Sequence, residues 1–202
     1  LDKENIPNGE AIYDNGDFTG VFLEGTADRI REEIPEPERE EKKQALMTAQ
    51  EDCFAVGLTS VVDAGLEKPV IEIIDSLQKA GELKMRLDVM LTPNEQNIDS
   101  YVKTGHYKPD RLNIHSIKLY ADGALGSRGA CLLEPYSDAP DTYGILVKKP
   151  DYYREMFELA YDNNYQVNTH AIGDSAVRFL LNEYGEFLEP GNDRRWRIEH
   201  AQ

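Results

Sequence analysis

The stretch that decides the fold is residues 116–122, Ser116-Ile117-Lys118-Leu119-Tyr120-Ala121-Asp122. It is short and mostly apolar, which predicts a buried strand rather than a helix. A lysine lies inside this strand and an aspartate ends it. A buried lysine carries a desolvation cost unless it is paired, deprotonated or modified, so this strand is also a place where chemistry is expected.

On both sides of this strand, apolar runs and helical periodicity alternate along the chain. Further strands are predicted at residues 58–63, 83–91, 165–170 and 197–200. Between them, apolar residues at helical spacing predict helices from Pro35 and Pro37 to Gly57, from Pro69 to Ala80, weakly over 94–103, from Pro150 onward, and after an Asp174 cap. This alternation predicts an α/β fold with a parallel sheet. The pattern leaves a (β/α)8 barrel and a doubly wound sheet open, but no strand is followed by a phosphate-binding glycine motif, which weighs against a nucleotide-binding sheet.

Two segments without periodicity set the domain organisation. Residues 1–35 carry four glycines among Asp, Asn and Glu, and they are predicted to be a loop-rich excursion. Residues 36–202 form the α/β domain. Within it, residues 123–149 are rich in Gly, Pro and Asp, and this segment is long enough to be functional.

The composition excludes several classes of partner. Lys+Arg 22 against Asp+Glu 38 gives a formal net charge of −16. So acidic a surface repels phosphate backbones and argues against nucleic acid and against a basic membrane-surface helix. No apolar run approaches a bilayer span. Cys53 and Cys131 are too few for a disulfide scaffold and lack the spacing of a structural zinc site, so both are expected to be small buried hydrophobes.

Both ends of the sequence bear on whether it is a whole protein or a piece of one. The chain begins Leu1-Asp2-Lys3 without Met and stops at Gln202, just after a predicted strand whose backbone would still need partners. We therefore expect a piece of a longer protein. The compartment is then left open, with the cytoplasm favoured.

The predicted strand ends bring reactive side chains to one edge of the sheet, which is where parallel α/β folds place their sites. His170 and His200 end successive strands, and Lys118 lies near the end of the strand before them. His106 falls in a loop, and His115 precedes a strand, which places it at the opposite face. Neutral imidazoles that converge on one point suit zinc or a related divalent ion.

Three interpretations of Lys118 stay open on the residues alone. Its amine could pair with a carboxylate such as Asp122. It could form a Schiff base with a carbonyl substrate. It could also react with carbon dioxide to give a carbamate, which is an anionic oxygen ligand able to bridge two metal ions.

Four stretches, in this order, carry a resemblance to a known family. They are Gly57–Gly65 (GLTSVVDAG), Ile117–Ala130 (IKLYADGALGSRGA), Asn168–Asp174 (NTHAIGD) and Arg197–Gln202 (RIEHAQ). Together they resemble amidohydrolase family 3 of the metal-dependent amidohydrolase superfamily, and Pro135-Tyr136-Ser137-Asp138 fits that family's loop after the strand. The likeness covers nearly the whole chain from about residue 18.

The resemblance implies a (β/α)8 TIM barrel that hydrolyses amide or other C–N bonds, flanked by a small β-domain. The family's metal ligands are a His-x-His pair after strand 1, a lysine or glutamate after strand 4, histidines after strands 5 and 6, and an aspartate after strand 8. Lys118, His170 and His200 match strands 4, 5 and 6. Zinc is the expected metal, as one or two ions, and carboxylation of Lys118 is one of its open interpretations. No His-x-His occurs in this chain. The resemblance therefore implies that the chain covers strands 2 to 6 only, a partial barrel.

The leading interpretation is the central part of a metal-dependent hydrolase that acts on a small-molecule substrate through a metal-activated water. Arg128 and Asp122, with the loop 123–149, are expected to line the substrate site, and a loop-tethering salt bridge is an equal alternative for Arg128. The other candidate functions are a Schiff-base lyase or aldolase that uses Lys118, and a non-catalytic barrel-derived binding module.

The incomplete sheet leads to two further expectations. A chain with at most three of the ligating groups is expected to bind zinc weakly and to be inactive by itself. Its two sheet edges, near Thr59–Asp63 and Arg197–His200, would expose unpaired backbone groups. Self-association through these edges is expected, with residues 1–35 folded across the sheet as the other candidate cover.

Overall fold

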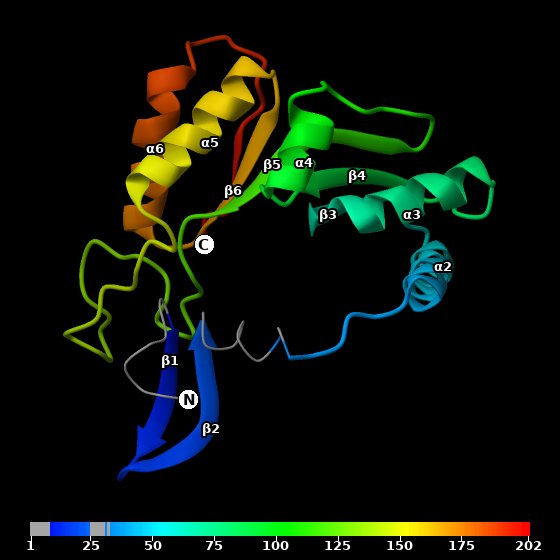
Figure 1. Cartoon of the computed structure of the whole chain (residues 1–202). Helices are drawn as coiled ribbons and strands as arrows, with labels where there is room; N and C mark the ends of the chain where they lie inside the picture. The colour runs from blue at the N-terminus through cyan, green and yellow to red at the C-terminus, as the bar shows by residue number, and fades with distance from the viewer. Residues whose placement is uncertain (1–8, 25–30, 32) are drawn as a thin grey trace.

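Five parallel strands form one sheet in the computed structural model, which describes residues 9–24, 31 and 33–202. Figure 1 shows this sheet with its helices and a separate hairpin. The strands are β3 (Ser60–Leu66), β4 (Arg86–Leu91), β5 (Leu112–Tyr120), β6 (Gln166–Ala171) and β7 (Arg197–His200). Strand order in the sheet follows order in the chain, without the reversal that defines a doubly wound sheet. The α/β prediction is confirmed, and the order is that of a partial barrel.

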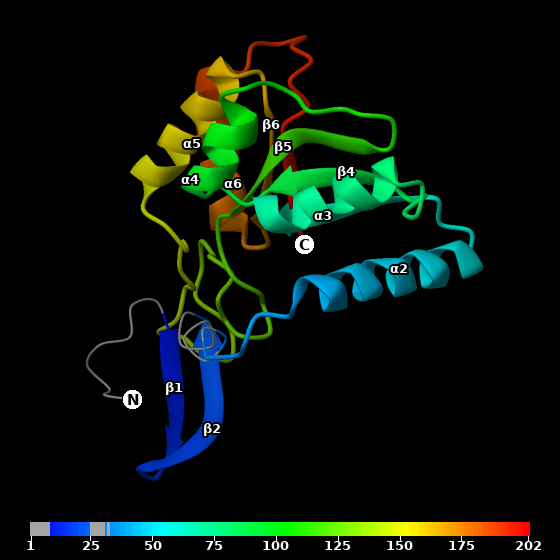
Figure 2. The same cartoon turned by 45° about the vertical axis from the view of Figure 1, so that its right-hand side comes forward.

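Helices connect these strands and cover them. They are α2 (Arg39–Ala55), α3 (Lys68–Lys79), α4 (Glu95–Asn97) followed by the π-helical turn Ile98–Val102, α5 (Pro150–Asp162) and α6 (Asp174–Phe187). Figures 1 and 2 show α3 alongside β4, and α5 and α6 alongside β6. None of the helices among the described residues is both long enough and apolar enough to cross a membrane.

The two faces of the sheet differ in chemistry. Val89 and Leu91 of β4 are fully buried in one hydrophobic core with Ile74 of α3. Successive side chains of a strand point to opposite faces, so Asp88, directly before Val89, lies on the other face. A shift of the strand register by one residue would turn the polar side chains into the core and the apolar ones out of it. Burial of the apolar face therefore fixes the face on which the polar side chains lie.

A hairpin replaces part of the predicted N-terminal loop. Strands β1 (Gly9–Asp14) and β2 (Asp17–Glu24) pair antiparallel, so the loop prediction for 1–35 is wrong over these residues. The missed signal is Asn15-Gly16, whose φ angles of 50° and 93° suit a tight hairpin turn. The hairpin forms its own sheet and pairs with neither β3 nor β7. The other residues of the predicted excursion include 1–8, 25–30 and 32, which lie outside the described residues.

Strand β5 begins four residues earlier than predicted, so it contains His115 rather than following it. Leu112 and Ile114 are buried while Asn113 and His115 are only partly buried. This half-polar alternation hid the start of the strand, because a buried parallel strand is expected to be continuously apolar. The register then shifts between Val89 and Met90 of the neighbouring strand.

The start of α6 corrects one further detail. The predicted cap Asp174 lies in the first helical turn, and Gly173 is the N-cap. The Asp174 carboxylate instead accepts a hydrogen bond from the Leu133 backbone N–H at 2.9 Å.

The segment 123–149 contains no helix and no extended strand, as predicted. It is nevertheless pinned to the rest of the domain. A Cβ at Gly173 would lie 2.0 Å from the Cys131 carbonyl oxygen, and one at Gly144 would lie 1.9 Å from that of Ala130. Only glycine permits these two close approaches. The first ties the segment to the turn between β6 and α6, and the second packs the segment against itself.

Candidate metal centre

Three neighbouring strands carry the side chains expected to hold metal. Lys118 lies near the end of β5, His170 near the end of β6, and His200 ends β7. In the sheet register Tyr120 pairs with His170, and Ala171 pairs with His200. The three side chains are thus mounted at the same carboxyl edge of the sheet, as the strand-end prediction requires.

The rings at this edge form a connected cluster. The His170 and His200 ring centres are 4.8 Å apart in an edge-to-face arrangement. The Tyr120 ring centre is 5.7 Å from that of His170. The Lys118 Nζ lies 4.6 Å from the Tyr120 ring centre, within the range of a cation–π contact.

One ring nitrogen of His170 is already engaged. Its Nε2 is 3.4 Å from the Gly123 carbonyl oxygen and 3.5 Å from Asp122 Oδ1. Both neighbours are acceptors, so the proton of the neutral ring belongs on Nε2. The Nδ1 lone pair is then available to a metal, in the arrangement by which outer partners orient histidine ligands.

The Asp122 carboxylate organises the turn around His170. It is fully buried, with Oδ1 accepting from the Ile172 N–H at 2.9 Å. Oδ2 accepts from the Cys131 N–H at 2.9 Å and from the Gly173 N–H at 2.8 Å. These bonds join the end of β5, the loop 123–149 and the turn before α6. They occupy both oxygens, so the geometry favours a positioning role over the substrate contact suggested by the sequence.

Burial shifts the pKa values of Lys118 and His170 in the direction that favours their neutral forms. It lowers the pKa of Lys118, whose side chain is 4% exposed, although the Glu199 carboxylate opposes the shift. Burial also lowers the pKa of His170, against the contrary effects of the Gly123 carbonyl and Asp122. A neutral imidazole is the form that binds a metal, and a neutral amine is the form that reacts as a nucleophile.

The donor set fits a divalent metal only if Lys118 is part of it. Among the residues that the structure describes, no three His, Cys, Asp or Glu side chains lie together as ligands. His170 and His200 supply two imidazoles, which suit zinc. Lys118 is the third group on the same edge, and it can contribute as a neutral amine or as a carbamate. Lys118 does not pair with Asp122, whose bonds go to backbone N–H groups and His170.

Arg128 makes the loop-tethering contact that was one of its two interpretations. Its guanidinium forms an ion pair with Asp138, with Nη2 3.0 Å from Oδ2 and Nε 3.4 Å from Oδ1. Both side chains are largely exposed. The contact closes the loop 123–149 upon itself, and a role for Arg128 in substrate binding stays a prediction.

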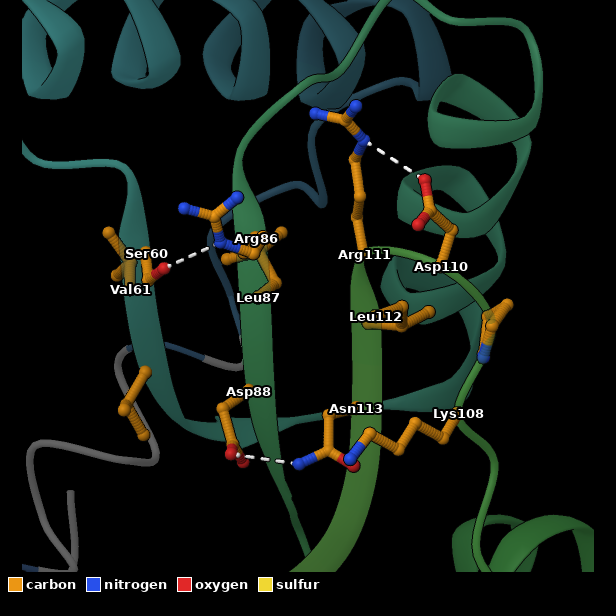
Figure 3. Close-up of a pocket in the computed structure, with 12 residues that line it drawn as sticks. Ser60, Val61, Arg86, Leu87, Asp88, Lys108, Asp110, Arg111, Leu112 and Asn113 are labelled. Atoms are coloured by element: carbon orange, nitrogen blue, oxygen red, sulfur yellow. Dashed lines mark hydrogen bonds and ion pairs between the residues drawn. The ribbon is translucent and has the colours of Figure 1, made fainter.

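The amino end of the sheet holds a different polar cluster around a cavity of about 350 Å³. Figure 3 shows Asp88 and Asn113 joined across β4 and β5, with the amide nitrogen 3.0 Å from the carboxylate. His115 continues this cluster, with Nδ1 2.9 Å from the Asn113 amide nitrogen and Nε2 3.1 Å from Gln166 Oε1. Both ring nitrogens of His115 are therefore occupied by side chains.

Sequence reasoning missed Tyr120 and the residues around it. Tyr120 is 51% exposed and lies between Lys118 and His170. The available signal was its spacing, because residues two apart on a strand share a face. The adjoining cavity could not be predicted, since it is lined by Gly65, Thr92 and Tyr152 from separate parts of the chain.

Fold and site together define a barrel-type α/β domain with imidazole and amine side chains at the carboxyl ends of its strands. The model of the amidohydrolase family matches residues 8–202. The chain therefore belongs to the amidohydrolase family.

Solved structures agree with this assignment. An uncharacterized metal-dependent hydrolase from Pyrococcus horikoshii OT3 superposes with a TM-score of 0.78 and 30% identity over 94% of this chain and 38% of its own. Another, from Pyrococcus furiosus, has a TM-score of 0.73 and 32% identity over 88% of this chain and 36% of its own.

Two curated proteins are also similar. The putative amidohydrolase YtcJ of Bacillus subtilis (strain 168) is 30% identical over 97% of this chain, and protein LONG AFTER FAR-RED 3 of Arabidopsis thaliana is 29% identical over 93%. The chain spans 38% and 35% of the lengths of these two relatives.

Proposed function

We propose that this chain is the central part of a metal-dependent hydrolase that cleaves an amide or other C–N bond of a small-molecule substrate. The observation that carries the proposal is the meeting of Lys118, His170 and His200 at one edge. The His170 Nε2 is held by acceptors, and no described residue hydrogen-bonds to its Nδ1. Membership of the amidohydrolase family and the metal-dependent hydrolases among the structural neighbours support it.

In this proposal His170 and His200 hold a divalent ion, with zinc the expected metal, and Lys118 completes the set within this chain. When bound, such an ion supplies an activated water and polarises the scissile carbonyl. Strands β3 to β7 correspond to strands 2 to 6 of an eight-stranded barrel. The His-x-His pair and the strand-8 aspartate of the resemblance would come from elsewhere in the complete protein.

Lys118 is proposed to act as a carbamate. The neutral amine adds to the carbon of carbon dioxide, an N–C bond forms, and one proton leaves to solvent, so the side chain becomes an anionic oxygen ligand. The lowered pKa of Lys118, caused by its burial, raises the fraction of neutral amine. Asp122 positions His170, and the loop 123–149 with Arg128 forms the wall on the substrate side.

The same lowered pKa of Lys118 favours one second candidate, a Schiff-base lyase or aldolase. Borohydride separates the two readily, because it reduces a Schiff base to a stable secondary amine. Trapping of a carbonyl substrate on Lys118 would support the lyase and contradict the hydrolase.

The test of the proposed function uses the complete native protein. We expect metal analysis to find one or two equivalents of divalent ion, and chelation to remove hydrolysis of an amide panel until zinc is restored. A complete protein that contains no metal and hydrolyses nothing after zinc loading would contradict the proposal and favour a non-catalytic binding module.

A further inference from the structure

A cavity of about 240 Å³ lies directly beside Lys118, at the carboxyl ends of β3, β4 and β5. One buried side chain fixes its shape. The Asn97 amide nitrogen donates to the Leu66 and Thr92 carbonyl oxygens, both at 2.8 Å. These two hydrogen bonds hold the end of β3 and the turn after β4 in place around the cavity. The cavity is smaller than the roughly 300–1,000 Å³ of sites for drug-sized ligands. It suits one group of a substrate rather than a whole large molecule.

Two hydroxyl groups face each other across Gly65 at this cavity. A Cβ on Gly65 would lie 3.6 Å from Thr92 Oγ1 and 3.9 Å from the Tyr120 hydroxyl oxygen. The Gly65 φ of +123° favours glycine, so this space stays open. Neither hydroxyl makes a hydrogen bond to another side chain or backbone group within the described part of the chain. Each O–H is free to donate to a ligand.

A cation lines the same cavity. Lys148 is exposed, and its Nζ is 5.9 Å from the centre of the Tyr152 ring. No ion pair joins Lys148 to any acidic side chain that the structure describes. By contrast, Lys79 and Lys103 pair with carboxylates at 2.6 and 2.7 Å. In a chain with 38 acidic and 22 basic residues, a lysine that lines a cavity beside two hydroxyl groups and has no described carboxylate partner can bind an anion.

The remaining walls are apolar or aromatic, contributed by Pro93, Leu119, Val147 and Tyr152. We propose that this cavity binds a carboxylate group carried by the substrate, held by the Lys148 ammonium and the Thr92 and Tyr120 hydroxyls. This inference rests on the proposed function, because the cavity shares Lys118 with the candidate metal centre. It narrows the substrate class to acids with a short apolar segment between the carboxylate and the bond that is cleaved.

A matched pair of probes tests the site by binding alone. Benzoate and benzamide have nearly the same shape and differ in charge, and their binding to the complete protein can be measured by calorimetry. The titrations use both metal-loaded and chelator-treated protein, since a carboxylate could also bind a metal. We expect benzoate to bind both forms, and benzamide to bind at least about tenfold more weakly, because charge-assisted hydrogen bonds are the stronger ones.

Variants then locate the binding group. Lys148→Met is expected to weaken benzoate binding about tenfold and to leave benzamide unchanged. The matched control is Lys149→Met, which removes an equally exposed neighbouring lysine that does not line the cavity, and we expect a change below about twofold. Tyr120→Phe, which keeps the ring and removes only the hydroxyl, should weaken benzoate severalfold.

The outcomes separate this site from the proposed function. Benzoate binding that depends on Lys148 supports the carboxylate site even in a preparation that hydrolyses nothing. Benzoate that binds only metal-loaded protein and is indifferent to Lys148 overturns the site, as does equal affinity for benzoate and benzamide. Equal losses in Lys148→Met and Lys149→Met would also overturn it, since they would indicate a general effect of charge.

Discussion

His115 and His170 lie on neighbouring strands, and each has a carboxylate oxygen close to one ring nitrogen, at 3.6 Å from Asp88 and 3.5 Å from Asp122. Their second nitrogens differ. Nδ1 of His115 meets the Asn113 amide nitrogen and its Nε2 meets Gln166, so no lone pair is left over. His170 engages Nε2, and its Nδ1 has no hydrogen-bond partner within the described part of the chain.

A histidine is available as a metal ligand when one of its ring nitrogens keeps an unshared lone pair. The polar side chains around His115, in the amino half of the sheet, hydrogen-bond to one another, which stabilises a half-buried polar face. In the carboxyl half, the Nδ1 atom of His170 and the Lys118 amine have no such hydrogen-bond partner among the residues that the structure describes. Burial and a nearby carboxylate are common to both sites, so neither identifies a metal centre. The Nδ1 lone pair of His170 is the feature that sets the proposed metal site apart.

The largest effect is expected from removing the ligands. In the complete protein, His170→Ala and His200→Ala should each reduce zinc affinity by more than about 100-fold and abolish hydrolysis, while circular dichroism stays near that of the wild type. His115→Ala should leave zinc affinity unchanged, because its ring has no nitrogen to offer. Equal losses of metal in His115→Ala and His170→Ala would break the comparison.

Substitution of Asp122 tests how His170 is positioned, and its expected effect is smaller. In either orientation, Asp122→Asn places an NH2 against a backbone N–H, so it should cost about 1–3 kcal/mol of unfolding free energy. It should also weaken zinc binding about 10–100-fold, because His170 loses its orienting partner. The control is Asp138→Asn, which removes only an exposed ion pair with Arg128. If zinc affinity falls equally in both variants, Asp122 does not position His170.

Part of this site could be predicted from the sequence. The strand ends His170 and His200 and the buried Lys118 were predictable, because apolar runs define the strands and strand ends define the edge. The free Nδ1 of His170 was not, since it depends on Gly123 and on backbone N–H groups that the fold brings to Asp122. The hairpin was missed because glycine and aspartate content outweighed a single Asn-Gly turn signal.

The smallest effect concerns the Arg128–Asp138 pair in the loop beside the site. The Arg128 guanidinium holds the pKa of Asp138 below its usual range. Because the folded pKa is below the unfolded one, the pair stabilises the loop above the unfolded pKa, and this contribution is lost as pH falls through the folded value. An NMR titration of the carboxyl carbon should show the low midpoint, and Arg128→Gln should move it back up. A midpoint that ignores the substitution would show that the pair does not persist in solution.

The most direct test of the metal centre is anomalous diffraction at the zinc edge from crystals of the complete protein. We expect a zinc peak about 2.0–2.1 Å from Nδ1 of His170 and from a ring nitrogen of His200, with Lys118 or its carbamate beside it. His170 Nε2 should remain on Gly123 and Asp122. A peak bound through His170 Nε2, or one at His115 with none between His170 and His200, would contradict it.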